Sequence, residues 1–112
     1  MTLSQFGIPT SLLEKMSETF SKYPDIQKVT LFGSRATGNF RDGSDIDLAI
    51  STPKADIITT LRIELDDLNS PYMIDLVDEN NLTNQALLKQ IRESGVVIYP
   101  NVLTVPKAFI KS

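Results

Sequence analysis

Two aspartates one residue apart lie inside an apolar segment, SDIDLAI, at positions 44–50. In a β-strand the side chains alternate between two faces, so Asp45 and Asp47 share one face and the apolar Ile46 and Leu48 share the other. Aspartate is disfavoured in strands, and like charges at this spacing repel each other unless a positive group lies between them. Carboxylate oxygens suit hard cations such as Mg²⁺ and Mn²⁺. The pair therefore points to chemistry that uses a divalent cation.

A third aspartate, Asp75, lies in the later apolar segment YMIDLV, residues 72–77. The same alternation puts Asp75 on one face together with Met73. If this strand lies roughly 4.8 Å from the strand that carries the first two acids, three carboxylates converge on one patch of the sheet. Several ionised, unpaired carboxylates in a partly buried place would cost several kcal/mol, and a shared divalent cation removes that cost. Asp45, Asp47 and Asp75 are therefore the candidate catalytic and metal-binding residues.

Each of these aspartates, taken alone, also has a simpler explanation. Asp45 could cap a turn, Asp47 could be solvated on an exposed face of the sheet, and Asp75 could pair with a nearby Arg or Lys. The metal site is favoured over these explanations because it accounts for all three acids at once.

A Gly-Ser pair ends the preceding β-rich run, and ten residues separate Ser34 from Asp45. A glycine allows close approach of the backbone, and a serine that opens a turn or short helix offers its hydroxyl and N–H groups to an anion such as phosphate. Arg35 can add a charge-assisted contact. Although a lone Gly-Ser pair is most often a plain turn, the two aspartates that follow favour a phosphate site made of Gly33, Ser34 and Arg35.

Composition excludes several other kinds of chemistry. The 112 residues include no His and no Cys, which excludes Ser/His/Asp and Cys/His catalysis, disulfides and zinc–sulfur sites. A formal net charge of −3 without a basic run argues against strong binding of free nucleic acid. Apolar runs such as 96–99 are too short to cross a bilayer, and the N-terminus lacks a secretory pattern. We therefore expect a cytoplasmic protein with no membrane partner.

Hydrophobic periodicity predicts the elements that position these residues. Helices are predicted at 9–22, at about 55–68 and around 87–91. Strands are predicted at 28–32, 45–50, 72–77 and 96–99. Ser11 and Glu14 have the spacing of a capping box in the first helix, and Gly95 is predicted to be the C-cap of the last one. The order is α, β, a short insert, β, α, β, α, β.

The chain length fits one domain with a single core. Its 41 % hydrophobic and 22 % charged residues are the proportions of an ordinary soluble globular protein. We place the domain at residues 1–100 and a C-terminal tail at residues 101–112. The tail keeps several apolar residues, so it could be an arm that docks a partner, or it could lie against its own domain or fray.

The combination of Gly33-Ser34, ten further residues and Asp45-Ile46-Asp47 resembles the signature of the polymerase-β-like nucleotidyltransferase superfamily. The stretch GSRATGNFRDGSDIDLAI is similar to its minimal (MNT) branch, and so are PYMIDLVD, the helix after it and GVVIY. The resemblance covers most of residues 1–100, which would form a minimal nucleotidyltransferase domain, and it leaves out the tail. It implies an α/β fold: a short mixed β-sheet of about four strands backed by helices.

Members of this family bind a nucleoside triphosphate together with Mg²⁺. By this resemblance Asp45 and Asp47 would bridge two metal ions, for which Mn²⁺ is a possible substitute. Asp75 would complete the site on the side of the attacking hydroxyl and could take its proton. Two cations can stabilise both the entering and the departing oxygen of an in-line displacement.

By the same resemblance Gly33 and Ser34 would hold the β- and γ-phosphates, with Arg35 as a supporting cation. The implied reaction is the transfer of a nucleoside monophosphate, AMP from ATP, with loss of pyrophosphate.

Minimal members of the family are commonly antitoxins paired with a HEPN-domain ribonuclease toxin, and some transfer AMP to a tyrosine of that toxin. Related small proteins pair with a separate helical substrate-binding subunit. The resemblance thus implies an adenylyltransferase and antitoxin whose acceptor is a partner protein. Two alternatives stay open: a non-catalytic binding module that neutralises or assists a helical partner, and a small-molecule, antibiotic-type nucleotidyltransferase. The nucleobase and the oligomeric state, including a homo-oligomer, are also left open.

Overall fold

The computed structural model describes residues 6–100. Residues 1–5 and the predicted tail at 101–112 lie outside the described residues, so the expectations for the tail stay untested. In chain order the elements are α1 (Thr10–Ser21), β1 (Lys28–Phe32), α2 (Ser34–Thr37), β2 (Ile46–Ser51), α3 (Ile57–Asp66), β3 (Ile74–Asp78), the 3₁₀ turn η1 (Glu79–Asn81), α4 (Gln85–Ser94) and β4 (Val96–Tyr99).

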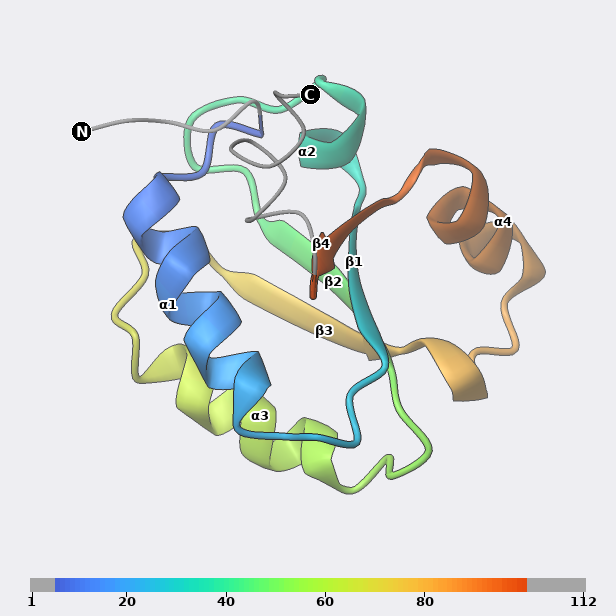
Figure 1. The fold of residues 1–112 in the computed structure, drawn as a ribbon. Coiled ribbons are helices and arrows are strands. Elements are labelled where there is room, and N and C mark those ends of the chain that lie inside the picture. Colours follow the sequence, from blue (N-terminus) through green and yellow to red (C-terminus); the bar gives the residue numbers. More distant parts are fainter. Residues whose placement is uncertain (1–5, 101–112) are drawn as a thin grey trace, which may run out of the picture.

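The four strands form one mixed sheet in the order β3-β2-β1-β4 (Figure 1). Strand β1 runs antiparallel to both β2 and β4, whereas β2 and β3 are parallel. Parallel neighbours need a crossover connection, and α3 lies in the segment that joins β2 to β3. The prediction of an α/β fold with a short mixed sheet of about four strands is confirmed.

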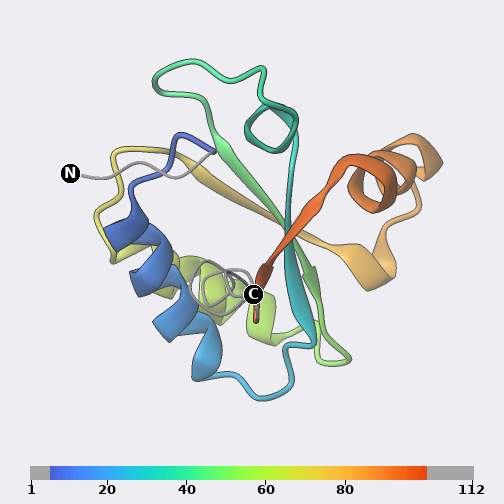
Figure 2. The same cartoon turned by 45° about the horizontal axis from the view of Figure 1, so that its top comes forward.

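Helices α1 and α3 cover one face of the sheet, and α4 lies against the other (Figure 2). The main core forms under α1 and α3 because each strand turns its alternate apolar side chains to that face. Strand β2 contributes Ile46, Leu48 and Ile50, and α3 contributes Leu61 and Leu65 at helical spacing; all of these are buried. This core fixes the direction in which β2 turns its other, polar face.

The opposite face of the sheet is only partly covered. Ile91 of α4 packs on Phe32 and Ala49 in a small second core. Beyond this contact the face carries Asp47, which is half-buried, and Asp75, which is exposed. One end of this face therefore stays open to solvent, and the predicted acids lie at that end.

Of the two predicted helix-end signals, the capping box is wrong and the glycine C-cap is confirmed. Helix α1 begins at Thr10 with Pro9 as the N-cap and no side-chain cap, so Ser11 and Glu14 do not form the predicted capping box. Ser11 already lies inside the first turn, too far along the chain to cap it. Gly95 is the C-cap of α4, as predicted; its backbone is extended (φ −74°, ψ 158°), and a Cβ there would lie 2.2 Å from a carbonyl oxygen of α4. Glycine is needed at that position for space.

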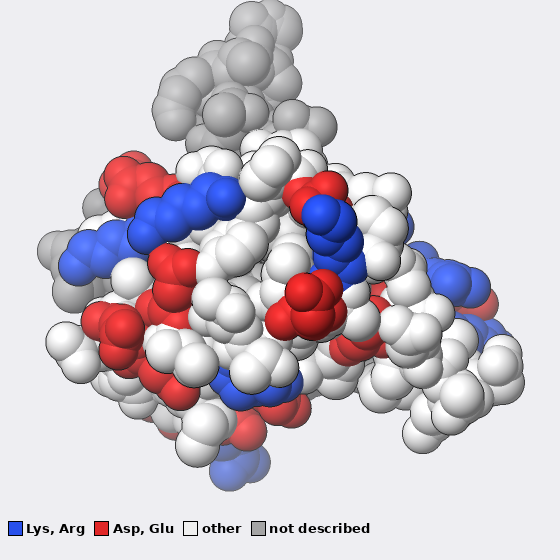
Figure 3. All heavy atoms as spheres, turned by 90° about the horizontal axis from the view of Figure 1, so that it is seen from below, with Lys and Arg blue, Asp and Glu red and all other residues white. Residues whose placement is uncertain are grey.

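Charged side chains of both signs are interspersed on the face of the molecule seen from below in Figure 1, and no broad basic patch forms on it (Figure 3). None of the helices within residues 6–100 has the length and hydropathy needed to cross a membrane.

Candidate active site

The acids of β2 and β3 lie directly opposite each other in the parallel strand pair. Asp47 pairs with Asp75 in the register, as Ile46 pairs with Ile74. Adjacent strands are about 4.8 Å apart, and residues directly opposite each other share a face. The predicted adjacency of the two strands is therefore confirmed, and the structure brings Asp47 and Asp75 together on one side of the sheet.

The sequence predicts that this strand begins at Asp45, but β2 begins one residue later, at Ile46. Asp45 therefore lies just outside the strand, and it is exposed. Burial raises the pKa of Asp47, and the negative charges of Asp75 and Asp45 raise it further. All three carboxylates are therefore electrostatically coupled at one end of the sheet, with Asp47 acted on by both of the others.

The donor set fits a hard divalent cation by its chemistry. The three side chains offer only oxygen ligands, and Asp47 is half-buried with two like charges near it. Within residues 6–100, no group of three such side chains is drawn together closely enough to form a ready-made metal site. The binding of Mg²⁺ or Mn²⁺ by these residues stays a prediction.

Gly33 follows β1 and lies against the carboxylate of Asp47. Its φ is +80°, and a Cβ built on it would lie 2.5 Å from Oδ2 of Asp47. A side chain at position 33 would therefore be strained and would displace the carboxylate. The structure shows close approach of the Asp47 carboxylate to Gly33, whereas approach of a phosphate to this glycine stays a prediction.

Ser34 opens α2, which is a single turn of helix. The carbonyl of Gly33 accepts hydrogen bonds from the N–H groups of Ala36 and Thr37, which closes this turn at the end of β1. Ser34 is half-buried and directly follows the glycine that touches Asp47. The structure thus places the Gly-Ser pair beside the acids, and its binding of phosphate stays a prediction.

Arg35 does not lie where a phosphate ligand is expected. The side chain is only 2 % exposed. Its Nε and Nη2 atoms donate to the carbonyl of Ser44 at 3.0 and 2.8 Å, and Nη1 donates to the carbonyl of Phe6 at 3.0 Å. The guanidinium carbon lies 4.6 Å from the ring centre of Tyr72 and 5.2 Å from that of Phe40. The expected supporting cation is therefore turned into the protein, because carbonyls and rings hold it there.

A sequence profile described as polymerase beta, nucleotidyltransferase, matches residues 14–102. This chain belongs to the polymerase beta nucleotidyltransferase family. The matched segment contains the Gly-Ser pair and all three candidate acids, so the family that the sequence resemblance indicated is confirmed. No curated protein sequence matches this nucleotidyltransferase significantly.

Solved structures with a similar fold come from toxin–antitoxin complexes. A chain of the MntA–HepT complex has a TM-score of 0.61 at 19 % identity, with 92 % of this chain and 86 % of that chain covered. A chain of a toxin–antitoxin complex with AMP-PNP has a TM-score of 0.61 at 22 % identity, with 93 % and 87 % covered. The complex of tri-AMPylated Shewanella oneidensis HEPN toxin with MNT antitoxin gives 0.58 at 20 % identity, with 91 % and 85 % covered. At these identities the similarity establishes a shared fold.

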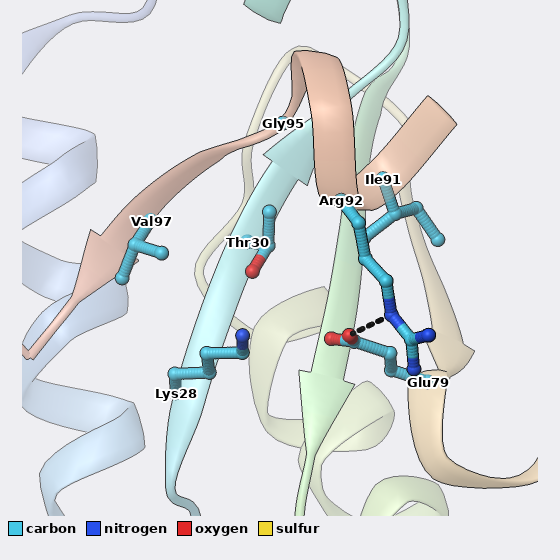
Figure 4. Close-up of a pocket in the computed structure, with 7 residues that line it drawn as sticks. All are labelled: Lys28, Thr30, Glu79, Ile91, Arg92, Gly95 and Val97. Atoms are coloured by element: carbon cyan, nitrogen blue, oxygen red, sulfur yellow. Dashed lines mark ion pairs between the residues drawn. The ribbon is translucent and has the colours of Figure 1, made fainter. Parts of the chain in front are cut away.

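The nucleotidyltransferase chain also contains a hollow that the sequence did not reveal. It has a volume of about 120 Å³ and is lined by residues of β1, η1, α4 and β4 (Figure 4). Glu79 is 6 % exposed; its Oε2 lies 3.7 Å from Nε of Arg92, and its Oε1 is buried without a partner in the described part of the chain. Glu79 belongs to a polar run that reads as a turn, so its burial depends on packing that no local pattern shows. The three candidate acids are not among the described residues that line this hollow.

Proposed function

We propose that this protein transfers a nucleoside monophosphate from a nucleoside triphosphate to a hydroxyl group of a partner protein, with ATP as the donor and AMP as the transferred group. The observation that carries the proposal is the pairing of Asp47 with Asp75 on neighbouring strands, with Asp45 coupled to them and Gly33 against the Asp47 carboxylate. This arrangement occurs in a chain of the nucleotidyltransferase family.

The transfer forms one bond and breaks one. The oxygen of the acceptor hydroxyl bonds to the α-phosphorus of ATP, the bond between that phosphorus and the oxygen leading to the β-phosphate breaks, and pyrophosphate leaves. Asp75 would accept the hydroxyl proton, because its exposed carboxylate can reach an incoming acceptor and lies opposite Asp47. Because a carboxylate can accept this proton, the reaction does not require a histidine, which the chain lacks.

Asp45, Asp47 and Asp75 would hold two Mg²⁺ ions, and Mn²⁺ could replace them. Such ions, when bound, neutralise phosphate charge and stabilise the entering and leaving oxygens of an in-line displacement. Coordination would also compensate the charges of Asp75 and Asp45 that raise the pKa of Asp47.

Gly33 and Ser34 would bind the β- and γ-phosphates. The absence of a side chain at position 33 lets a phosphate approach the turn at the end of β1, next to Asp47. Arg35 has no part in this contact, since its guanidinium is directed at the carbonyls of Ser44 and Phe6.

The class of partner is proposed from the structural neighbours. In one of them an MNT antitoxin accompanies a HEPN toxin that is tri-AMPylated. We propose that a HEPN-type toxin is the acceptor here and that this chain is its antitoxin. The open end of the acid-bearing face supports an acceptor of protein size, because Asp75 is exposed there and Met73, two residues earlier on the same face, is 68 % exposed.

Mass spectrometry of the native complex tests this proposal. The complex is purified from cells that make the protein and is incubated with ATP and Mg²⁺. The wild-type protein should add AMP to its partner, the double variant Asp45→Asn/Asp47→Asn should not, and Glu18→Gln on the exposed side of α1 should behave like the wild type. No added AMP with the wild-type protein contradicts the proposal. An acid variant that still neutralises the partner in cells favours the non-catalytic binding module instead.

A further inference from the structure

We propose that Arg35 is a positioning residue for Asp45: it fixes the loop that carries this acid to the place where a cation and nucleotide are held. The inference rests on the proposed function. The guanidinium of Arg35 is fully buried in α2, just before the 38–45 loop, whereas Asp45 at the end of that loop is exposed.

The hydrogen bonds of Arg35 converge on the residue next to Asp45. Two guanidinium nitrogens donate to the same carbonyl oxygen, that of Ser44, at 3.0 and 2.8 Å. This carbonyl and the N–H group of Asp45 belong to one planar peptide unit. A clamp on the carbonyl therefore sets the orientation of the backbone from which the Asp45 side chain departs.

Asp45 needs such a clamp because it lies outside the sheet. The first ladder bond of this region, at 2.8 Å, runs from the N–H of Ile46 to the carbonyl of Met73. Asp47 and Asp75 lie within β2 and β3, so each has paired strand residues both before and after it along the chain. Asp45 has the sheet on one side only, and on the other side a loop that contains the turn around Gly43 at φ +84°.

Two aromatic rings hold the guanidinium itself. Phe40 comes from the same loop, and Tyr72 comes from the segment that leads into β3, three residues before Asp75. Arg35 therefore links the turn after β1 to both acid-bearing strands. A lysine could keep the positive charge, but it could not give a planar fork to one carbonyl while a planar guanidinium lies over two rings.

A calorimetric titration with Mn²⁺ and AMP-PNP tests the inference without relying on transfer activity. Because outer groups that orient metal ligands typically change metal affinity about 10- to 100-fold, Arg35→Lys should weaken binding of this pair by at least about tenfold. Arg41→Lys, an exposed arginine of the same loop, should bind like the wild type. If Arg35 acts through Asp45, adding Arg35→Lys to Asp45→Asn should weaken binding no further than Asp45→Asn alone.

A second pair of variants covers the case in which Arg35→Lys does not fold. Tyr72→Leu removes the ring face 4.6 Å from the guanidinium, and Tyr72→Phe keeps it. Tyr72→Leu should weaken binding of Mn²⁺ with AMP-PNP several-fold in a folded protein, whereas Tyr72→Phe should bind like the wild type. A purely structural role for Arg35 predicts lower thermal stability of the variants with unchanged affinity.

The inference is overturned if folded Arg35→Lys and Tyr72→Leu bind as tightly as the wild type, or if the effects of Arg35→Lys and Asp45→Asn add in full. These outcomes leave the proposed function intact. A wild-type protein that does not bind Mn²⁺ with AMP-PNP at all removes the proposed function, and the inference with it.

Discussion

The fold disfavours the ionised form of the Asp47 carboxyl group, whose pKa is raised. Burial raises its pKa most, and the charges of Asp75 and Asp45 raise it further. A carboxyl group whose pKa is raised by folding binds its proton more tightly in the folded state, so its ionised form destabilises the fold. The candidate site therefore lowers the stability of the metal-free protein, as functional sites often do.

The substitution Asp47→Asn should raise the melting temperature of the metal-free protein by a few degrees. The difference in unfolding free energy between wild type and variant should be smallest below the pKa of Asp47 in the unfolded chain, about 3.9. It should widen as pH rises through the raised pKa of Asp47 in the folded protein, and stay constant above that. Urea unfolding in EDTA from about pH 3 to pH 8 measures this gap. Glu18→Gln, which removes an exposed charge on α1, should show no such widening. A wild type as stable as Asp47→Asn at neutral pH contradicts this account.

Gly33→Ala should impair transfer more than backbone strain alone explains. Gly33 and Gly38 both have positive φ, +80° and +89°, but only at Gly33 would a Cβ meet a neighbour, Oδ2 of Asp47 at 2.5 Å. Each alanine variant should lose roughly 1–3 kcal/mol of unfolding free energy from strain. Only Gly33→Ala should also lower kcat/KM, by at least about tenfold, since it displaces a carboxylate. Equal loss of kcat/KM in the two variants argues against the contact.

The strands show how far local pattern predicts this fold. Strands β1 and β4 have the predicted bounds, because short runs of β-branched and aromatic residues between turn signals mark them clearly. Strands β2 and β3 begin one and two residues later than predicted. Asp45 and Tyr72 continue the alternation in sequence, but the backbone there belongs to the connections, where Ser70 binds the backbone of Tyr72. Alternation predicts faces well and strand ends less well.

The placement of Asp47 and Asp75 on one face follows from alternation once β2 and β3 are neighbours, whereas the burial of Arg35 does not follow from any local pattern. Arg35 is held by Ser44, nine residues along the chain, and by Phe6 and Tyr72, which are much farther away in sequence. Contacts of this kind form when segments distant in sequence pack together. The hydrophobic periodicity within any one segment does not predict them. An arginine after a Gly-Ser pair reads equally well as a phosphate ligand, so only the structure separates the two roles.

Helices α1 and α3 are joined by a polar contact that is sensitive to high pH. Tyr23 donates a hydrogen bond to Glu64, which also pairs with Lys22 at 3.0 Å. This hydrogen bond, burial and the charge of Glu64 raise the pKa of Tyr23 to about 12. A raised tyrosine pKa means that the contact stabilises the fold below pH 10 and that this contribution is lost between pH 10 and about 12.

Tyr23→Phe should therefore be less stable than the wild type at neutral pH, and the difference should shrink as pH rises above 10. Chemical unfolding at neutral pH and at about pH 11 measures it, and tyrosinate absorbance should lose the titration near pH 12 in the variant. Tyr72→Phe is the matched control, because it also removes a tyrosine hydroxyl but at a ring that lies over the guanidinium of Arg35. A stability difference between wild type and Tyr23→Phe that grows as pH rises above 10 would contradict this account.

The fold as a unit closes one face of its sheet and leaves part of the other open. The helices α1 and α3 seal the main core, and α4 covers the second face beside the acids (Figure 2). In the proposed function, substrate and acceptor would approach the part of this face that carries the acids and that α4 leaves open. Met73, two residues before Asp75, is exposed and would give an incoming protein surface an apolar contact in the proposed function.

Met73→Glu should therefore weaken transfer to the partner, by about tenfold in kcat/KM, while the affinity for AMP-PNP changes less. Ile63→Glu is the matched control, because Ile63 is similarly exposed, at 59 % against 68 %, but lies on α3 behind the other face of the sheet. Titration calorimetry and the transfer assay separate the two effects. Equal loss of transfer in both variants would place the acceptor elsewhere.

Labelling of the native complex tests most directly whether this protein transfers a nucleotide with Asp45, Asp47 and Asp75. The complex is incubated with Mg²⁺ and, in parallel samples, with ATP that carries radioactive phosphorus at the α or at the γ position. The account predicts that the partner becomes labelled from α-labelled ATP only, and that Asp45→Asn, Asp47→Asn or EDTA abolishes the label. Label from γ-labelled ATP, or α-label that persists in the Asp47→Asn variant, would contradict it.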